Sequence, residues 1–123
     1  MTFTPLPVLE QELDEIRRDC GTNGWDGYGA EPVSDESYHW GRHLISLLPA
    51  TIPVPNVAAA PDGCFVFEWS TGPTAVVSVS PSAHGVIDFA ALFDHEKTYG
   101  HLEFDDRFPS EIERLILRIF PLG

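Results

Sequence analysis

Between residues 56 and 104, short apolar runs alternate with clusters of turn residues, and this pattern constrains the fold more than any other feature of the chain. Runs of this length that are rich in Val, Phe and Trp are typical of β-strands, and the Pro-Asp-Gly sequence at 61–63 favours a tight turn. Because connections of a few residues join antiparallel neighbours, we expect an antiparallel meander of about five strands. The runs are 56–60, 64–69, 74–80, 86–93 and 98–104.

The second of these runs indicates which face of the sheet should be covered. Phe65, Phe67 and Trp69 alternate with smaller or charged residues. Successive residues of a strand point to opposite faces, so the three aromatic side chains, which occupy every second position, share one face. We expect this face to pack against helices.

Two helices are predicted before the strands. From Pro7 to Cys20, apolar side chains recur at helical spacing, and a Gly-Thr-Asn-Gly sequence follows as a stop. A second helix should begin after Ser34, which is a good N-cap, and should end at Pro49. Gly41 lies inside this helix, where glycine is unfavourable, so we expect another element to pack closely against it.

A third helix is predicted near the C-terminal end. Ser110 and Glu113 have the spacing of a capping box, in which a serine and a glutamate each bond a backbone N–H of the first turn. Ile112, Ile116 and Ile119 then lie along one apolar face. The order of elements predicts an α+β fold, with two N-terminal helices, a five-stranded sheet and one C-terminal helix in a single domain over 1–123.

The chain is strongly acidic. Its 123 residues include 19 Asp and Glu against seven Lys and Arg, which gives a net charge of −12. No basic stripe is present to neutralise phosphates, so direct binding to nucleic acid or to an anionic membrane is disfavoured. Two interpretations remain: the charge confers solubility, or acidic faces bind a basic partner.

The first residues lack the basic and apolar segments of a secretory signal, and no apolar run is long enough to span a membrane. We therefore expect a cytoplasmic protein in which Cys20 and Cys64 are reduced thiols. Free strand edges at 56–60 and 98–104 leave open whether the protein is a monomer or a homodimer.

The sequence Gly-Trp-Asp-Gly-Tyr-Gly-Ala-Glu-Pro at 24–32 lies between the two N-terminal helices. It contains no lysine and its acids would repel an anion, so a phosphate-binding loop is disfavoured. We expect a structural turn in which Asp26 caps backbone N–H groups while Trp25 and Tyr28 fold inward. The alternative is that an exposed Trp25 or Tyr28 serves as an interface residue.

His39 and His43 are four residues apart on the second helix, a spacing that allows both imidazoles to bind one metal ion. The intervening residues lack the glutamate base of zinc hydrolases, and a third ligand would have to come from a turn histidine. Surface histidines are the simpler interpretation, so we expect no metal and no cofactor, with a small metal-dependent hydrolase as a remote alternative. The turn histidines are His84, His95 and His101.

Three segments of the chain together resemble a family of small bacterial proteins of uncharacterised function. They are Asn-Gly-Trp-Asp-Gly-Tyr-Gly-Ala-Glu-Pro-Val-Ser at 23–34, Pro-Asp-Gly-Cys-Phe-Val-Phe-Glu-Trp at 61–69 and Phe-Asp-Asp-Arg-Phe-Pro-Ser-Glu-Ile at 104–112. That family carries a Trp-Asp-Gly-Tyr-Gly-Ala-x-Pro motif, then a Pro-Asp-Gly and Glu-Trp hairpin, then a short C-terminal helix. The resemblance covers about residues 22–119. It implies a bacterial, phage or mobile-element origin and brings no catalytic residue or cofactor.

The function predicted from these features is binding rather than catalysis. No nucleophile motif surrounds Cys64, Ser78 or Ser80, so we expect that the chain is not an enzyme. Small size, acidic charge and many aromatic residues favour an inhibitor of a basic protein or nucleoprotein complex, as phage-type anti-CRISPR and anti-restriction proteins are. An immunity or antitoxin-like protein, or a housekeeping interaction domain, is the alternative. The predicted partner-binding residues are Asp14, Glu15, Asp19, Trp25, Tyr28, Asp94, Glu96, Asp105 and Asp106.

Overall fold

The computed structural model describes residues 6–82 and 84–120 and confirms the predicted α+β fold. All five strands are antiparallel and neighbouring strands in the chain pair with one another, in the order β1-β2-β3-β4-β5. The elements are α1 (Leu6–Asp19), α2 (Asp35–Ser46), β1 (Asn56–Ala59), β2 (Phe65–Gly72), β3 (Ala75–Pro81), β4 (Val86–Phe93), β5 (Glu96–Glu103) and α3 (Ser110–Ile119).

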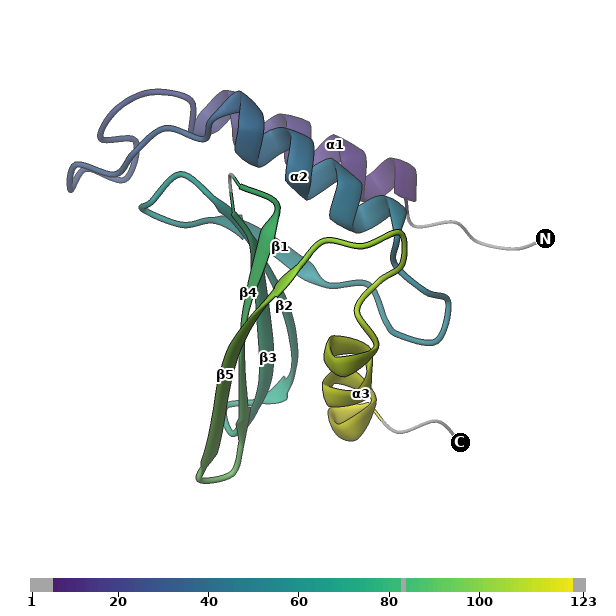
Figure 1. Cartoon of the computed structure of the whole chain (residues 1–123). Coiled ribbons are helices and arrows are strands. Elements are labelled where there is room, and N and C mark those ends of the chain that lie inside the picture. Colours follow the sequence, from purple (N-terminus) through teal and green to yellow (C-terminus); the bar gives the residue numbers. More distant parts are fainter. Residues whose placement is uncertain (1–5, 83, 121–123) are drawn as a thin grey trace.

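The helices of the described residues cover one end and one face of the sheet. Helices α1 and α2 run side by side over one end of the sheet, and α3 lies beside the strands further along (Figure 1). Helix α2 contacts β2 and β3, α1 contacts α2 and β1, and α3 contacts β2 and β3. In the described part of the chain, no helix is long and apolar enough to cross a membrane.

The core lies between the helices and the aromatic face of β2, as predicted. Phe65 and Phe67 are fully buried and Trp69 is 1% exposed. The indole Nε1 of Trp69 donates a hydrogen bond of 2.7 Å to the carbonyl oxygen of Pro53, so the large ring is buried without leaving its N–H unsatisfied. The remaining fully buried core side chains include Leu9, Leu13, Leu44, Ile112 and Ile116.

The predicted close approach at Gly41 is confirmed. A Cβ atom at this position would lie 3.0 Å from Cδ2 of Phe65, which is tighter than ordinary van der Waals contact. Glycine therefore allows α2 to lie directly on the aromatic ring. The N-cap is also confirmed, since the Oγ of Ser34 accepts a 3.0 Å hydrogen bond from the backbone N–H of Ser37.

The predicted capping box at the start of α3 is wrong. The N-cap position is Pro109, which has no side-chain cap, and Ser110 is already the first helical residue. Because the helix begins one residue earlier than expected, the serine is out of position for the N-cap bond. The carboxylate of Glu113 instead accepts a 2.6 Å hydrogen bond from Oγ1 of Thr51, and so ties α3 to the loop before β1.

Candidate functional site

In the loop at 24–32, Asp26 caps backbone N–H groups as the sequence predicts. Oδ1 of Asp26 accepts hydrogen bonds from the backbone N–H groups of Tyr28 and Ala30, at 2.8 and 3.1 Å. The backbone N–H of Gly24 donates to the carbonyl of Ala30 at 2.8 Å and closes the loop. These bonds give the loop a fixed shape of its own where it extends past the ends of α1 and α2 (Figure 1).

The two aromatic residues of this loop behave differently from each other. Trp25 is half-buried and its Nε1 donates a 2.6 Å hydrogen bond to the carbonyl of Glu31, so it anchors the loop as predicted. The prediction that Tyr28 also folds inward is wrong, because its side chain is 92% exposed. Tyr28 stands between Gly27 and Gly29, which both have positive φ, and the chain reverses around it and leaves the ring in solvent.

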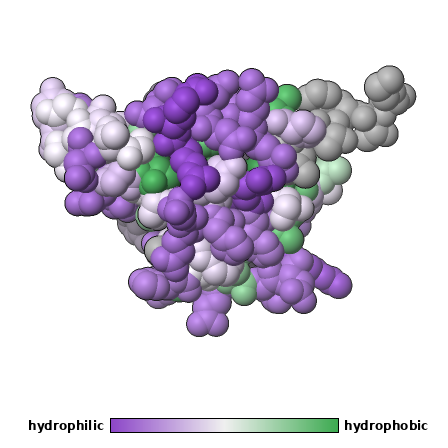
Figure 2. Space-filling view, turned by 90° about the horizontal axis from the view of Figure 1, so that it is seen from above, coloured by the Kyte–Doolittle hydropathy of each residue, from purple (hydrophilic) through white to green (hydrophobic). Residues whose placement is uncertain are grey.

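The two N-terminal helices and the loop between them, residues 6–46, form a surface that we call the helix layer. It carries nine carboxylates and three guanidinium groups, so half of the net charge of −12 lies in this third of the chain. Seen from above in Figure 2, this face is predominantly hydrophilic. The carboxylates are Glu10, Glu12, Asp14, Glu15, Asp19, Asp26, Glu31, Asp35 and Glu36.

Each arginine of the helix layer already lies beside one of these carboxylates. Arg17 pairs with Asp35. Arg42 lies 3.2 Å from Glu10, and Arg18 lies 3.6 Å from a carboxylate oxygen of Asp19. The layer therefore presents an excess of negative charge rather than alternating charges.

Asp14, a predicted binding residue, is engaged inside the layer. It accepts a hydrogen bond from the hydroxyl of Tyr38, and this bond raises the pKa of Tyr38 above its usual value. The guanidinium of Arg17 lies 4.3 Å from the centre of the same tyrosine ring. Glu15 and Asp19 are exposed on α1, and Glu36 is exposed at the start of α2.

The other predicted acids lie outside residues 6–46. Asp94 and Glu96 lie at the turn between β4 and β5, at the opposite end of the sheet from the helix layer (Figure 1). Glu96 lies 3.2 Å from Arg118 of α3. Asp105 and Asp106 lie in the segment between β5 and α3, where the Asp105 carboxylate accepts a 2.7 Å hydrogen bond from the backbone N–H of Asp106. The nine predicted residues therefore do not form one surface, because the turn between β4 and β5 is remote from the helix layer.

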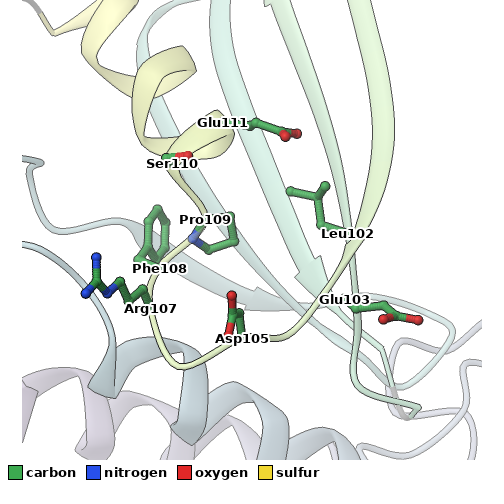
Figure 3. Close-up of a pocket in the computed structure, with 8 residues that line it drawn as sticks. All are labelled: Leu102, Glu103, Asp105, Arg107, Phe108, Pro109, Ser110 and Glu111. Carbon is green, nitrogen blue, oxygen red and sulfur yellow. The ribbon is translucent and has the colours of Figure 1, made fainter.

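A shallow pocket of about 340 Å³ lies where β5, the following segment and the start of α3 meet. Its carboxylates come from Glu103, Asp105 and Glu111, and all three residues are exposed (Figure 3). The side chain of Arg107 extends to the side away from Glu103 (Figure 3). General acid–base chemistry needs carboxylates held in a cleft that excludes water, whereas these three residues are exposed to solvent.

The histidines of α2 pack against aromatic rings. His43 lies 5.2 Å from the ring of Phe104 and 5.8 Å from that of Trp40, while Trp40 stacks on Phe104 at 4.7 Å. This contact joins α2 to the end of β5. Within residues 6–82 and 84–120, no group of three or more His, Cys, Asp or Glu side chains is placed to hold a metal ion.

Both cysteines are free thiols and both are half-buried. Burial raises the pKa of the Cys64 thiol above its usual value, and the Oγ of Ser37 donates to its sulfur at 3.8 Å. At neutral pH this thiol is therefore protonated, and the protonated form is a poor nucleophile.

We call the side of the sheet that faces away from the helices the open face. The sequence did not predict a binding surface there. Two shallow depressions of about 230 and 310 Å³ lie on this face, and Tyr99, which is 72% exposed, lines both of them. Small and apolar residues alternate along β3 and β4, and this pattern could have indicated the open face. Other residues lining the depressions are Val66, Val76, Ser78, Ala90 and Leu92.

Comparison of the chain with protein families, with curated proteins and with solved structures finds no match.

Proposed function

We propose that the chain is a non-enzymatic binding protein whose acidic helix layer docks on a basic surface of a partner protein. In its most specific form, the layer occupies a basic groove of a bacterial nucleic-acid-handling complex, in the manner of anti-CRISPR and anti-restriction proteins. The observation that carries the proposal is the concentration of charge. Half of the net charge lies in residues 6–46, where each arginine is already beside a carboxylate.

A basic groove that binds nucleic acid is shaped and charged to receive a polyanion, so a compact acidic surface can compete for it. Complementary charge accelerates the encounter, and a few aromatic or apolar contacts then hold the complex. Tyr28 is suited to such a contact, because its ring is exposed on a loop that hydrogen bonds hold in shape. Trp25 supports that loop through its bond to Glu31.

Two charge variants of the full chain test this proposal. The helix-layer variant carries Glu15→Lys, Asp19→Lys and Glu36→Lys, all at exposed positions. The distal variant carries Glu68→Lys, Asp88→Lys and Glu111→Lys, which are also exposed and lie outside the layer. Both variants change the net charge equally, from −12 to −6, so they separate the effect of position from the effect of total charge.

The experiment is a quantitative capture from bacterial lysate with the wild type and both variants, washed at low and at high salt. We expect one nucleic-acid-binding complex to be retained by the wild type and the distal variant, and to be lost by the helix-layer variant and by the high-salt wash. If the captured protein is instead a single basic nuclease with the same behaviour, the chain is an immunity-type inhibitor. Retention that is the same for all three proteins would contradict the proposal.

A further inference from the structure

Strand β5 leaves one long edge of the sheet free. It is the last strand in the order, and in the described part of the chain it pairs with β4 alone. Its eight residues, Glu96–Glu103, offer backbone N–H and C=O groups along that edge. The other edge is different, because β1 has four residues and contacts α1.

We propose that β5 pairs with β5 of a second copy of this chain, antiparallel and centred on Gly100, so that the two sheets become one continuous sheet of ten strands. This inference goes beyond the proposed binding function and does not rest on it.

Antiparallel geometry limits the registers that β5 can adopt with its own copy. Residues that lie directly opposite each other in an antiparallel pair point to the same face of the sheet. On β4, the core residues Ile87 and Ala91 point toward the helices, so the even-numbered positions that alternate with them point to the open face. The β5 residues that pair with those even-numbered positions also point to the open face. They are Lys97, Tyr99, His101 and Glu103. In a symmetric dimer, a residue of this set can therefore lie opposite only another member of the set.

Charge then selects one register. Lys97 is the only lysine of the chain. Within β5, the register in which Gly100 lies opposite Gly100 is the one that places Lys97 opposite a carboxylate, that of Glu103. The two-fold symmetry produces this charge pair twice, and it places Tyr99 opposite His101 twice. Shifting the strands by two residues in one direction would place Lys97 opposite His101, and in the other direction would place Tyr99 opposite Glu103.

The same register brings apolar groups together on both faces at its centre. On the open face, the two Tyr99 rings become diagonal neighbours, a separation of roughly 7–8 Å that aromatic side chains can bridge. On the other face, Phe89 lies over Gly100, where a Cβ atom would be 2.5 Å from the Cζ of the phenyl ring. Two facing glycines would leave room for the two Phe89 rings to approach each other across the interface.

The test is the mass of the full chain in solution, measured by sedimentation velocity over a wide range of concentration. The wild type is expected to approach twice its chain mass of 13.6 kDa as concentration rises. Lys97→Glu and Glu103→Lys should each weaken the dimer roughly tenfold, because each variant converts two attractive cross-strand pairs into two repulsive ones. The double variant Lys97→Glu/Glu103→Lys restores both pairs and should recover the dissociation constant of the wild type.

Circular dichroism of each variant confirms that it is folded, and the helix-layer variant should dimerise like the wild type, since its substitutions lie outside β5. A wild type that stays monomeric at every concentration would overturn the proposal and would indicate that Lys97 protects the free edge from pairing. A dimer that the single reversals leave intact, or that the double variant fails to rescue, would place the interface elsewhere and would overturn this register.

Discussion

Gly63 and Gly27 both have positive φ, at +84° and +81°, but only Gly63 is crowded. A Cβ atom at Gly63 would lie 2.5 Å from the carbonyl oxygen of Pro32, whereas nothing lies within 4 Å of a Cβ at Gly27. Gly27→Ala should therefore lower the free energy of unfolding by about 1 kcal/mol, which is the cost of holding a residue with a Cβ atom at positive φ. Gly63→Ala should lower the free energy of unfolding by more, about 2–4 kcal/mol, because the backbone at Pro32 must also move to make room for the Cβ atom.

Urea denaturation of the Gly27→Ala and Gly63→Ala proteins measures both free energies directly. Equal losses in the two variants would mean that the approach of the 60–64 turn to Pro32 does not stabilise the fold.

The hydrogen bond between Tyr38 and Asp14 gives a pH-dependent prediction. It raises the pKa of Tyr38 in the folded state above the unfolded value of about 10. The bond therefore contributes fully below pH 10, and this contribution is lost as pH rises through the folded-state pKa. Tyr38→Phe should be less stable than the wild type by a constant amount below pH 10, and the difference should shrink above it.

Thermal unfolding of the wild type and Tyr38→Phe at a series of pH values checks this behaviour. Tyr28→Phe is the matched control, because Tyr28 makes no side-chain hydrogen bond among the described residues. A stability difference between wild type and Tyr38→Phe that stays constant up to strongly alkaline pH would contradict the assigned bond.

Among the elements, helix α3 should be stabilised by burial of its apolar face and not by its N-cap. Ile112 and Ile116 are fully buried, and the N-cap residue Pro109 makes no side-chain cap bond. Ile116→Ala should therefore cost about 2–5 kcal/mol, which is typical of a buried isoleucine truncated to alanine. The exposed Arg114, on the same helix, should change stability by at most about 0.5 kcal/mol when replaced by alanine.

Chemical denaturation of Ile116→Ala and Arg114→Ala, followed by circular dichroism, gives both values. Comparable losses in the two proteins would show that α3 contributes little to the core.

The helices and strands were predictable where a single sequence pattern leaves few alternative structures. Alternation of Phe65, Phe67 and Trp69 placed the buried face of β2, because period-two burial leaves few other arrangements. Gly41 indicated a close contact, although the sequence did not say that Phe65 would make it. The capping box failed because two helix starts one residue apart differ little in local energy, and tertiary contacts such as that between Thr51 and Glu113 decide between them.

The proposed binding surfaces were less predictable than the fold. The sequence located the acids but not their positions in space, so it grouped Asp94 with Asp14 although they lie at opposite ends of the sheet. Tyr28 was expected inside because large aromatic residues are usually buried, and the glycines beside it reversed that outcome. Such placements depend on long-range packing, which local patterns do not encode.

The whole molecule presents two surfaces with two proposed roles. The acidic helix layer would bind a basic partner, while the β5 edge would join two copies. The layer and the turn between β4 and β5 lie at opposite ends of the sheet (Figure 1), so a dimer formed along β5 can carry two layers. Such a dimer would bind a partner with two basic sites more tightly than one site alone, because the second contact is intramolecular.

If the helix layer docks as proposed, it competes with nucleic acid for one basic groove. The most direct measurement is a fluorescence anisotropy titration, in which the captured partner is first bound to labelled nucleic acid and the chain is then added. We expect the wild type and the distal variant to release the nucleic acid, and the helix-layer variant to leave it bound. A ternary complex that keeps the nucleic acid bound, or equal release by both variants, would contradict the proposal.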